Sequence, residues 1–456
     1  MLTIETHRTK EKVRKERCDS KSLERQVRQL LADKISGNLV GVWLLIPEYL
    51  RLGIWDLLKS WSAAADECVE PRLALQLVNE AALCVNGVRQ KRTLSQKGFE
   101  LANGLPFVAT DAAIHFLLNG HSVAEAQRLQ IALGKIRSTF GHFKAQLLAI
   151  DPHRVQSHSK RQMVRRRKHS RDKASKMVQT IFCLDAHTCQ PVCFVTGTSA
   201  RTATEAAKEL LKMSAQILKI GDKPLVVADT EHYTAELYEW VSADATFDLL
   251  TPVASSKALE AAIATMAQDQ FQPHWAGYAT TTRQFHFKND SRPFCQFIQR
   301  KGERAEDYDF KAFLCTSNRE QLSALSEGYP DRWHIEEFFN RDQALGWNRA
   351  GTMNLNIQYG KTTMSLLAQA ALHMLRQRIG DPVSGWDSLH FANGVLRGLE
   401  GDVRVKNDTV IVTYYNAPNS ELLKKHYEQL PEKLANEGVL AKIPWLYDFK
   451  LDFRFK

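Results

Sequence analysis

Acidic residues end two of the most apolar segments of the chain. One segment runs from Leu147 to Asp151 and the other from Leu225 to Asp229, and in each the Asp is the first polar residue. Short apolar runs of this length are typical of buried strands, so each Asp is expected at the end of a strand. Carboxylate oxygens are ligands that Mg²⁺ prefers. Asp151 and Asp229 are therefore candidate metal ligands for chemistry on phosphate groups.

A third Asp follows an apolar run and competes with Asp151. Asp185 comes directly after residues 181–184, which are apolar. If Asp185 ended the first strand of the sheet, only one strand would lie between it and the next helix. If Asp151 ends the first strand, two strands lie between it and that helix, and these form the hairpin that the fold requires. The order of elements therefore favours Asp151. Asp185 is left as a turn residue, a role typical of Asp-x-x-Thr sequences.

A third carboxylate is expected on a helix that follows the sheet, and residues 329–339 have this character. Tyr329, Arg332 and Glu336 lie at positions i, i+3 and i+7, so their side chains project from one face of the helix. Glu337 is the rival of Glu336, but it is rotated by about 100° from that face. We therefore expect Glu336 to be a metal ligand and Arg332 to bind phosphate beside it.

Three carboxylates arranged in this way suit the cleavage and joining of phosphodiester bonds. Such chemistry uses two metal ions about 3.5 to 4 Å apart, one at the attacking oxygen and one at the leaving oxygen. The expected cofactor is Mg²⁺, as two ions, with Mn²⁺ able to substitute. The expected ligands are Asp151, Asp229 and Glu336.

An α/β sheet is needed to position these acids. From Phe143 onward, short runs rich in Val, Ile, Leu, Phe and Cys alternate with turns and helices. The pattern predicts strands over residues 145–150, 178–184, 192–196, 225–228 and 247–251, and helices over residues 202–218 and 234–241. The order strand, strand, strand, helix, strand, helix, strand is that of an RNase H-like domain.

The charge of the chain favours a nucleic acid as partner. There are 61 Lys and Arg against 51 Asp and Glu, a net charge of +10. Between His153 and Lys176, ten Lys or Arg stand against one acid, in a run without apolar periodicity. This run is either a solvated charged loop or a loop that binds the DNA backbone. Its place directly after Asp151 favours binding, with the central basic residues Arg165, Arg166, Arg167 and Lys168.

The segment around Glu336 resembles the DDE transposases of bacterial insertion sequences, in the group with the signature Tyr-x2-Arg-x3-Glu-x6-Lys. Tyr329, Arg332 and Glu336 have the spacing of this signature, and the Val-Val-Ala-Asp strand that ends at Asp229 matches the second carboxylate of the family. The resemblance implies that the first carboxylate is Asp151, that a β-rich insertion separates the second and third acids, and that a helical DNA-binding domain precedes the core. The architectural resemblance extends over most of the chain, whereas the specific motifs lie around Asp229 and in residues 329–339.

One position departs from the family pattern. Seven residues after Glu336 the family has a Lys that contacts DNA phosphate, and this chain has Gln343. Arg341 lies nearby and is a candidate for the same contact. The sequence also leaves open whether His232 and Tyr233 face the cleft or simply begin a helix.

The expected fold class is α/β, with an RNase H-like catalytic core that contains a β-rich insertion and follows an all-helical domain. Five parts are expected along the chain. They are a helical DNA-binding domain (residues 1–140), the first part of the core (141–254), the insertion (255–318), the second part of the core with the helix of Glu336 (319–385), and a C-terminal region (386–456) with a β-hairpin over residues 403–415.

The cellular setting is expected to be the bacterial cytoplasm, in association with the nucleoid. No apolar run approaches the roughly 20 residues that a membrane-spanning helix needs. The charged segment over residues 6–28 has no apolar signal-peptide region. The eight cysteines include no Cys-x-x-Cys pair, which argues against a zinc ribbon or a disulfide framework.

The function predicted from these features is that of a DNA transposase with metal-dependent endonuclease and strand-transfer activity at the ends of an insertion sequence. Tyr329 and Arg332 would position the DNA end. The resemblance implies cut-and-paste transposition by a homodimer bound to double-stranded DNA. Two alternatives remain open. One is a domesticated RNase H-like nuclease that no longer inserts DNA, which Gln343 favours, and the other is a non-catalytic DNA-binding protein.

Overall fold

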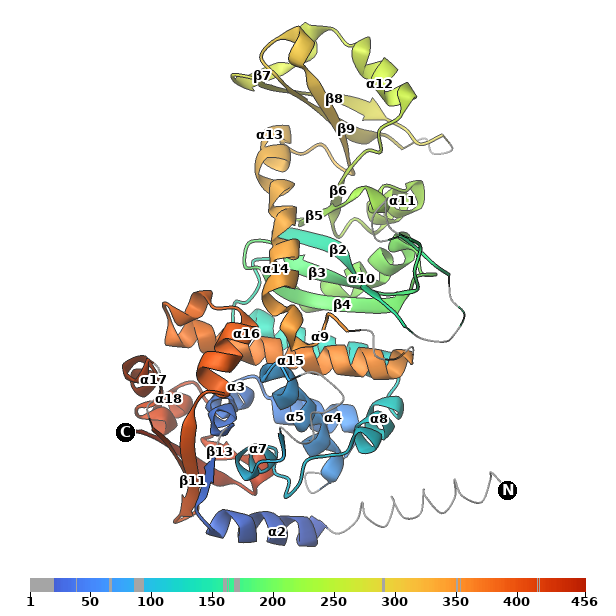
Figure 1. Cartoon of the computed structure of the whole chain (residues 1–456). Helices are drawn as coiled ribbons and strands as arrows, with labels where there is room; N and C mark the ends of the chain where they lie inside the picture. The colour runs from blue at the N-terminus through green and yellow to red at the C-terminus, as the bar shows by residue number, and fades with distance from the viewer. Residues whose placement is uncertain are drawn as a thin grey trace, which may run out of the picture. The chain divides into compact units, whose positions relative to one another are not determined.

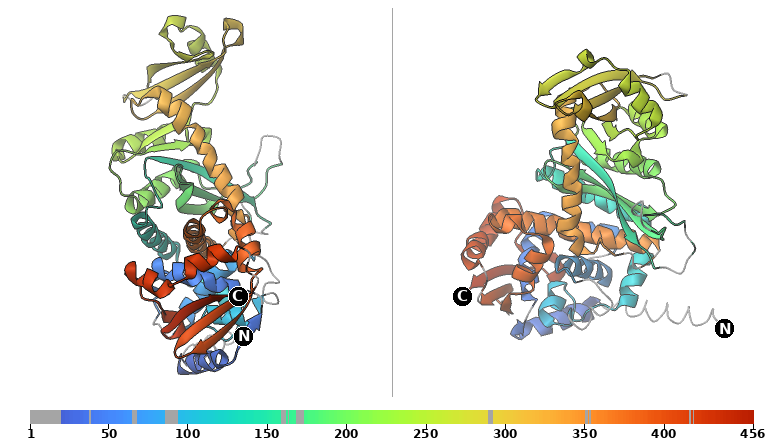
Figure 2. Two further views of the ribbon diagram at one scale, coloured as in Figure 1. Left: turned by 90° about the vertical axis from the view of Figure 1, so that its left-hand side faces the viewer. Right: turned by 45° about the horizontal axis from the view of Figure 1, so that its top comes forward.

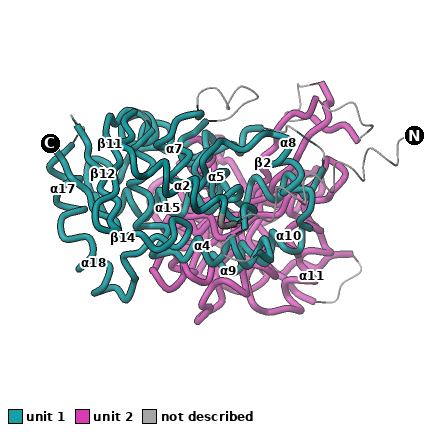
Figure 3. Tube along the Cα trace, turned by 90° about the horizontal axis from the view of Figure 1, so that it is seen from below, with its two compact units in different colours: residues 1–133, 341–456 teal, residues 134–340 magenta. Residues whose placement is uncertain are grey.

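The computed structural model describes residues 20–37, 39–64, 68–85, 94–158, 162, 164–167, 173–288, 292–349, 352, 354–415, 417 and 419–456. The chain divides into two compact units, which Figure 3 distinguishes by colour. The terminal unit comprises residues 1–133 and 341–456, and the central unit comprises residues 134–340. This grouping differs from the five expected parts, because the helical segment and the C-terminal region lie in one unit and residues 341–385 belong to that unit.

Helices make up most of the terminal unit. Apolar residues at three- and four-residue spacing give them buried faces, as with Ile54, Leu58 and Trp61 of α4. The long helix α15 packs against α5 near the start of the chain. The α-helices are α2 (Ser20–Ala32), α3 (Ile46–Arg51), α4 (Ile54–Ser62), α5 (Val69–Ala82), α7 (Lys97–Ala102), α8 (Asp111–Asn119), α15 (Leu355–Ile379), α16 (Ser388–Phe391), α17 (Ser420–Tyr427) and α18 (Leu430–Asn436); α9 (Val123–Thr139) contains the boundary between the units.

A five-stranded sheet joins the early and late parts of the terminal unit. Its order is β1-β11-β12-β14-β13, with β1 at Ile35–Gly37, β11 at Glu400–Lys406, β12 at Thr409–Tyr415, β13 at Lys442–Ile443 and β14 at Phe449–Phe455. β11 and β12 form the hairpin that the sequence predicts. Its turn residues Asn407 and Asp408 have φ angles of 51° and 54°, which Asn and Asp adopt more readily than most residues. β1 pairs with β11, so the first strand of the chain completes a C-terminal sheet.

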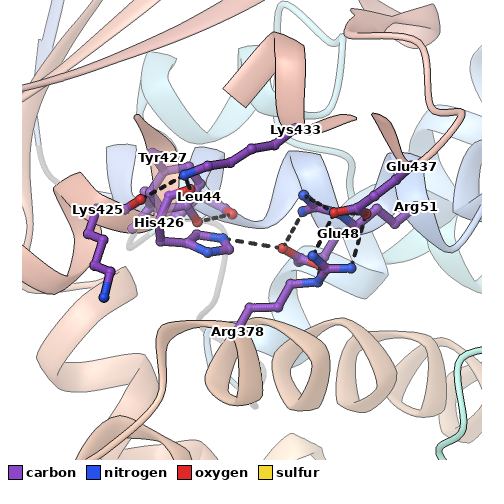
Figure 4. Close-up of polar contacts among 9 residues, drawn as sticks. All are labelled: Leu44, Glu48, Arg51, Arg378, Lys425, His426, Tyr427, Lys433 and Glu437. Atoms are coloured by element: carbon purple, nitrogen blue, oxygen red, sulfur yellow. Dashed lines mark hydrogen bonds and ion pairs between the residues drawn. The ribbon is translucent and has the colours of Figure 1, made fainter. Parts of the chain in front are cut away.

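A buried ion-pair network, shown in Figure 4, also ties α3 to α15 and to the C-terminal helices. Glu48 is fully buried and accepts a hydrogen bond of 2.8 Å from Arg51. Glu437 accepts hydrogen bonds from Arg51 at 2.7 Å and from Arg378 at 2.8 Å. The Nε2 atom of His426 lies 3.6 Å from a Glu48 oxygen. Because a buried charge without a partner is strongly destabilising, the network holds segments that are distant in sequence in one unit.

The central unit is built on a sheet of order β4-β3-β2-β5-β6-β10-β9-β8-β7. Its first half contains β2 (Leu147–Gln156), β3 (Met177–Asp185), β4 (Gln190–Thr198), β5 (Leu225–Ala228) and β6 (Asp248–Pro252). β3 is antiparallel to β2 and β4, while β2, β5 and β6 are mutually parallel. Helix α10 (Ala203–Ile217) connects β4 to β5, and α11 (Ala235–Asp244) connects β5 to β6. The order of strands and helices predicted from the sequence is therefore confirmed.

The helices of this half begin at side chains that cap them. Thr202 and Glu205 form a reciprocal capping box at the start of α10, and the Thr234 hydroxyl accepts a hydrogen bond from the backbone of α11. A further helical segment runs from α13 (Gln321–Ser323) through short π and 3₁₀ turns into α14 (His334–Asp342). Figures 1 and 2 show this segment crossing the strands of the sheet.

The predicted β-rich insertion extends the same sheet. It contains β7 (Gln272–Trp275), β8 (Tyr278–Phe285), β9 (Phe294–Lys301) and β10 (Asp309–Cys315), together with the helix α12 (Lys257–Ala264). β10 pairs antiparallel with β6, which joins the insertion to the first five strands. A small core of its own includes Ile263, Phe271 and Ile298. No helix in the described part of the chain is both long and apolar enough to cross a lipid bilayer.

Candidate active site

Asp151 and Asp229 lie side by side at one edge of the central sheet. The parallel pairing of β2 with β5 ends at Ile150 and Ala228, so the two acids are the next residues on neighbouring strands. The sequence predicted that this strand ends at Ile150, which is wrong, because β2 continues to Gln156 through pairing with β3. Asp151 therefore marks the end of the parallel pairing and not the end of its strand, whereas Asp229 directly follows β5 and begins the 3₁₀ turn η2 (Thr230–His232).

Glu336 reaches the same region from the helical segment that crosses the sheet. The turn of this segment that carries Arg332, η6 (Pro330–Trp333), is a 3₁₀ helix, and α14 begins at His334. The guanidinium of Arg332 lies 3.6 Å from an Asp151 oxygen and 3.4 Å from a Glu336 oxygen. It also lies 6.0 Å from the centre of the Tyr329 ring. The structure therefore brings Asp151, Tyr329, Arg332 and Glu336 together, as their spacing predicts.

The helix α14 is held in this orientation by its apolar face. Ile335 and Phe338 are buried, and Phe338 and Phe339 contact the ring of Phe182 on β3 with ring centres 5.5 Å and 5.6 Å apart. The Nδ1 atom of His334 lies 2.9 Å from the carbonyl oxygen of Ala186 and anchors the start of the helix. This packing directs Glu336 toward the acids of the sheet, while the neighbouring Glu337 is exposed.

The pKa values of Asp151 and Asp229 are shifted in opposite directions. Burial raises the pKa of Asp151 to about 7, and the negative charges of Asp229 and Glu336 act in the same direction, against the opposing effect of Arg332. Burial alone would also raise the pKa of Asp229, but the hydrogen bonds from His232 and from the backbone N–H of Glu231 outweigh this effect, and the pKa lies below its ordinary value. The site therefore combines one carboxylate that resists ionisation with one that favours it.

The three carboxylates fit a divalent metal ion by their chemistry. Carboxylate oxygens are suitable ligands for Mg²⁺ and Mn²⁺, and the repulsion that raises the pKa of Asp151 is of the kind that a bound cation relieves. Among the residues that the structure describes, no three His, Cys, Asp or Glu side chains are gathered closely enough to hold an ion as they stand. The Arg332 guanidinium lies between Asp151 and Glu336 and supplies the positive charge there.

Comparison with known families agrees with this geometry. Residues 142–368 match the family model of the transposase DDE domain. This region of the chain is therefore similar to a transposase DDE domain. The matched region includes Asp151, Asp229 and Glu336, and proteins of this family act in DNA transposition and generally use divalent metal ions.

Other comparisons add little to the DDE domain match. No curated protein matches the chain. Among solved structures, the chain is similar to one described as a cryo-EM structure of the piggyBac transposase synaptic complex with hairpin DNA, at 13% sequence identity and a TM-score of 0.42, covering 89% of this chain and 87% of that chain. A likeness this weak assigns neither fold nor function.

Asp185, the rival for the first position in the DDE domain, has a structural role. It is fully buried, and its carboxylate accepts hydrogen bonds from the backbone N–H groups of Lys144, Ala145 and Thr188 at 2.7, 2.8 and 3.0 Å. It pairs with Leu148, near the start of β2, whereas Asp151 lies in the middle of that strand. These contacts make Asp185 the turn residue that the sequence predicts.

The basic segment of the DDE domain is described only in part. Arg165 and Arg167 are exposed and Arg166 is half-buried, whereas Lys168 lies outside the described residues. Arg166 forms an isolated β-bridge with Ser175. This segment keeps exposed positive charge in the loop that follows β2.

Glu231 links this loop to the turn of the second carboxylate, a role that the sequence did not indicate. Its carboxylate forms ion pairs with Arg154 on β2 and, at 3.5 Å, with Arg166. Arg154 belongs to the basic run expected as a loop between His153 and Lys176, but the structure places this residue within β2. The one sequence signal for an ion pair with Glu231 was the high density of positive charge between His153 and Lys176.

Arg341 and Gln343 lie in the terminal unit. The Arg341 guanidinium donates to the carbonyl oxygens of Ser384 at 2.9 Å and Trp386 at 3.4 Å. A phosphate contact by Arg341 would have to compete with these two hydrogen bonds. Gln343 begins a short 3₁₀ turn and is half-buried.

Proposed function

We propose that the chain is a DNA transposase that cleaves and joins DNA strands at the ends of an insertion sequence, with Asp151, Asp229 and Glu336 as catalytic residues. One observation carries this proposal: within a transposase DDE domain, these carboxylates come from two neighbouring parallel strands and from a helix that crosses the sheet. The strand order β4-β3-β2-β5-β6, with α10 after the third strand in sequence and α11 after the fourth, supports an RNase H-like core.

The three carboxylates would hold two Mg²⁺ ions, for which Mn²⁺ can substitute. When bound, such ions lower the pKa of the attacking oxygen and stabilise the charge on the leaving oxygen. The raised pKa of Asp151 means that this side chain must lose a proton before it can act as a ligand. Asp229, with its lowered pKa, is ready as an anion at neutral pH.

Arg332 and Tyr329 would position the DNA end beside the acids. The Arg332 guanidinium carries five N–H donors and reaches two carboxylates in this structure, so it can also bind phosphate oxygens. Burial raises the pKa of Tyr329, which keeps its phenol protonated as a hydrogen-bond donor. Arg165, Arg166, Arg167 and Lys168 would bind the DNA backbone, and Arg341 would add a contact from the terminal unit.

The reaction would proceed in two chemical steps on the same site. Water first attacks the phosphorus atom at the end of the element and releases a 3′-hydroxyl, and this hydroxyl then attacks a phosphorus atom of the target DNA. Cut-and-paste transposition requires two ends to be held together, for which we propose a homodimer.

The decisive experiment is Mg²⁺-dependent cleavage of a duplex that carries the end of the element. We expect Asp151→Asn, Asp229→Asn and Glu336→Gln to abolish cleavage and retain DNA binding. Glu337→Gln serves as the matched control, and Asp185→Asn tests the rival position, with thermal melting to verify that this buried variant is folded. A Glu337→Gln control that loses cleavage while Glu336→Gln retains it would refute the assigned helix face.

The two alternatives predict different products in this assay. A nuclease that no longer inserts DNA, as the replacement of the family Lys by Gln343 suggests, would cleave the end without joining it to target DNA. A DNA-binding protein without catalysis would bind the duplex equally well in the wild type and in Asp229→Asn, and would release no product with Mg²⁺ or Mn²⁺.

A further inference from the structure

His232 is a fully buried side chain beside the second carboxylate. Its Nδ1 atom lies 2.9 Å from Oδ1 of Asp229, and none of its surface is exposed. A carboxylate that is ionised can only accept hydrogen bonds. As a metal ligand Asp229 is ionised, so the proton of this hydrogen bond belongs to the imidazole, and Nδ1–H donates to Asp229.

The turn after β5 adds a second donor to the same oxygen. The backbone N–H of Glu231 donates to Oδ1 of Asp229 at 3.0 Å. The turn itself is closed by the hydrogen bond from the His232 N–H to the Asp229 carbonyl oxygen, at 3.1 Å. In the described part of the chain, no donor is recorded for the other carboxylate oxygen, Oδ2, and the Asp229 side chain is 36% exposed. One oxygen is thus fixed by the protein and the other is left for a ligand.

The second ring nitrogen of His232 argues against a role in packing alone. Nε2 is buried and has no hydrogen-bond partner among the described residues. A buried polar atom without a hydrogen-bond partner destabilises the folded state. An apolar side chain could fill this space without that cost, so packing alone does not explain the imidazole, whereas the hydrogen bond between Nδ1 and Asp229 does.

We infer that His232 is a positioning residue that holds Oδ1 of Asp229 and thereby directs Oδ2 toward a divalent metal ion. The inference rests on the proposed function, because it assigns a task to the same site. Hydrogen bonds to the ligands of a metal orient them, and their loss typically lowers metal affinity about 10- to 100-fold. His232 would act through Asp229 and would not touch the DNA.

Two amide substitutions separate this role from simple packing. The amide of His232→Asn lies near the place of Nδ1, whereas the amide of His232→Gln reaches toward the place of Nε2. Mn²⁺ binding is measured by electron paramagnetic resonance on the full chain without DNA. We expect His232→Asn to bind Mn²⁺ within about threefold of the wild type and His232→Gln to bind at least about tenfold more weakly. Thermal melting in EDTA verifies that both variants are folded.

Cleavage measured against Mn²⁺ concentration gives a second readout. We expect His232→Gln to need more Mn²⁺ for half-maximal cleavage and to recover most of its maximal rate at saturating Mn²⁺. Equal Mn²⁺ affinity of the Asn and Gln variants would overturn the inference, even if the wild type cleaves DNA. A wild type that binds Mn²⁺ but does not cleave would overturn the proposed function, and the Asn and Gln comparison would still decide the role of His232.

A measurement on the wild type needs no variant. Nitrogen-15 NMR of labelled histidines in the metal-free protein identifies which ring nitrogen carries the proton. Protonation at Nδ1 supports the inference. A His232 that carries its only proton on Nε2 could not donate to Asp229 and would refute it.

Discussion

Replacement of Asp151 by Asn is expected to stabilise the metal-free protein while abolishing metal-dependent cleavage. The carboxylate of Asp151 is only 18% exposed, and burial together with the charges of Asp229 and Glu336 opposes its ionisation. Asn has nearly the same shape and carries no charge. The substitution therefore removes an unfavourable charge and, with it, a proposed metal ligand.

The magnitude follows from the pKa of this side chain. The pKa of Asp151 is raised from 3.8 to about 7 in the folded protein. Between these values the folded state binds a proton that the unfolded state has released, so stability falls as pH rises, by about 1.4 kcal/mol per pH unit. The loss is complete above the folded pKa and amounts to at most about 4 kcal/mol. The advantage of Asp151→Asn should grow between pH 4 and pH 7 and then level off.

The assay is urea denaturation in EDTA at pH 5 and pH 8, and Asp229→Asn is the matched control. The pKa of Asp229 is lowered, so this carboxylate contributes stability that is present above its unfolded pKa and is lost as pH falls through its folded pKa. Asp229→Asn should therefore destabilise the protein at pH 8, the opposite of Asp151→Asn. A stability difference between Asp151→Asn and the wild type that is the same at both pH values would refute the reasoning.

Four further substitutions test other parts of the structure. Glu48→Gln should lower the free energy of unfolding by about 1.5 to 3 kcal/mol in urea denaturation, because it weakens a buried, charge-assisted hydrogen bond while Arg51 keeps Glu437 as its second partner; an unchanged midpoint would contradict this. Arg332→Lys should reduce Mg²⁺-dependent cleavage at least about tenfold, since an ammonium lacks the planar fork that spans two acids, whereas full activity would show that charge alone suffices. Arg165→Ala and Arg167→Ala should each reduce the slope of log affinity for DNA against log salt by about 1, and an unchanged slope would remove that residue from the DNA contact.

The positions of the acids were predictable from the sequence because local patterns encode them. The apolar runs before Asp151 and Asp229 specify buried strands, and parallel neighbours place the next residue of each strand at the same edge. The spacing of Tyr329, Arg332 and Glu336 puts them on one face even though the first turn is a 3₁₀ helix. In both cases a few neighbouring residues determine the geometry.

Features that depend on distant pairing were not predictable. The continuation of β2 beyond Asp151 contains Pro152 and polar residues, which argue against a strand, and it exists because β3 pairs with it as far as Gln156. The junction of the insertion with the main sheet depends on pairing between β6 and β10. The pairing of β1 with β11 joins residues near positions 35 and 403. No local sequence pattern identifies which distant strand a given strand will pair with.

The same long-range contacts explain why the role of His232 was invisible in the sequence. A His three residues after an Asp is ordinary in a turn, and only the complete burial of its ring distinguishes it. Burial of Nε2 without a hydrogen-bond partner is destabilising, so the hydrogen bond of Nδ1 is the interaction that explains a histidine at this position. The contrast between the two aspartates follows from this arrangement, because a donor fixes Asp229 as an anion while Asp151 has Arg332, and no comparable donor among the described residues. A site in which one carboxylate is always charged and the other titrates near neutrality should gain metal affinity steeply between pH 6 and pH 8, with Asp151 as the group that sets the midpoint.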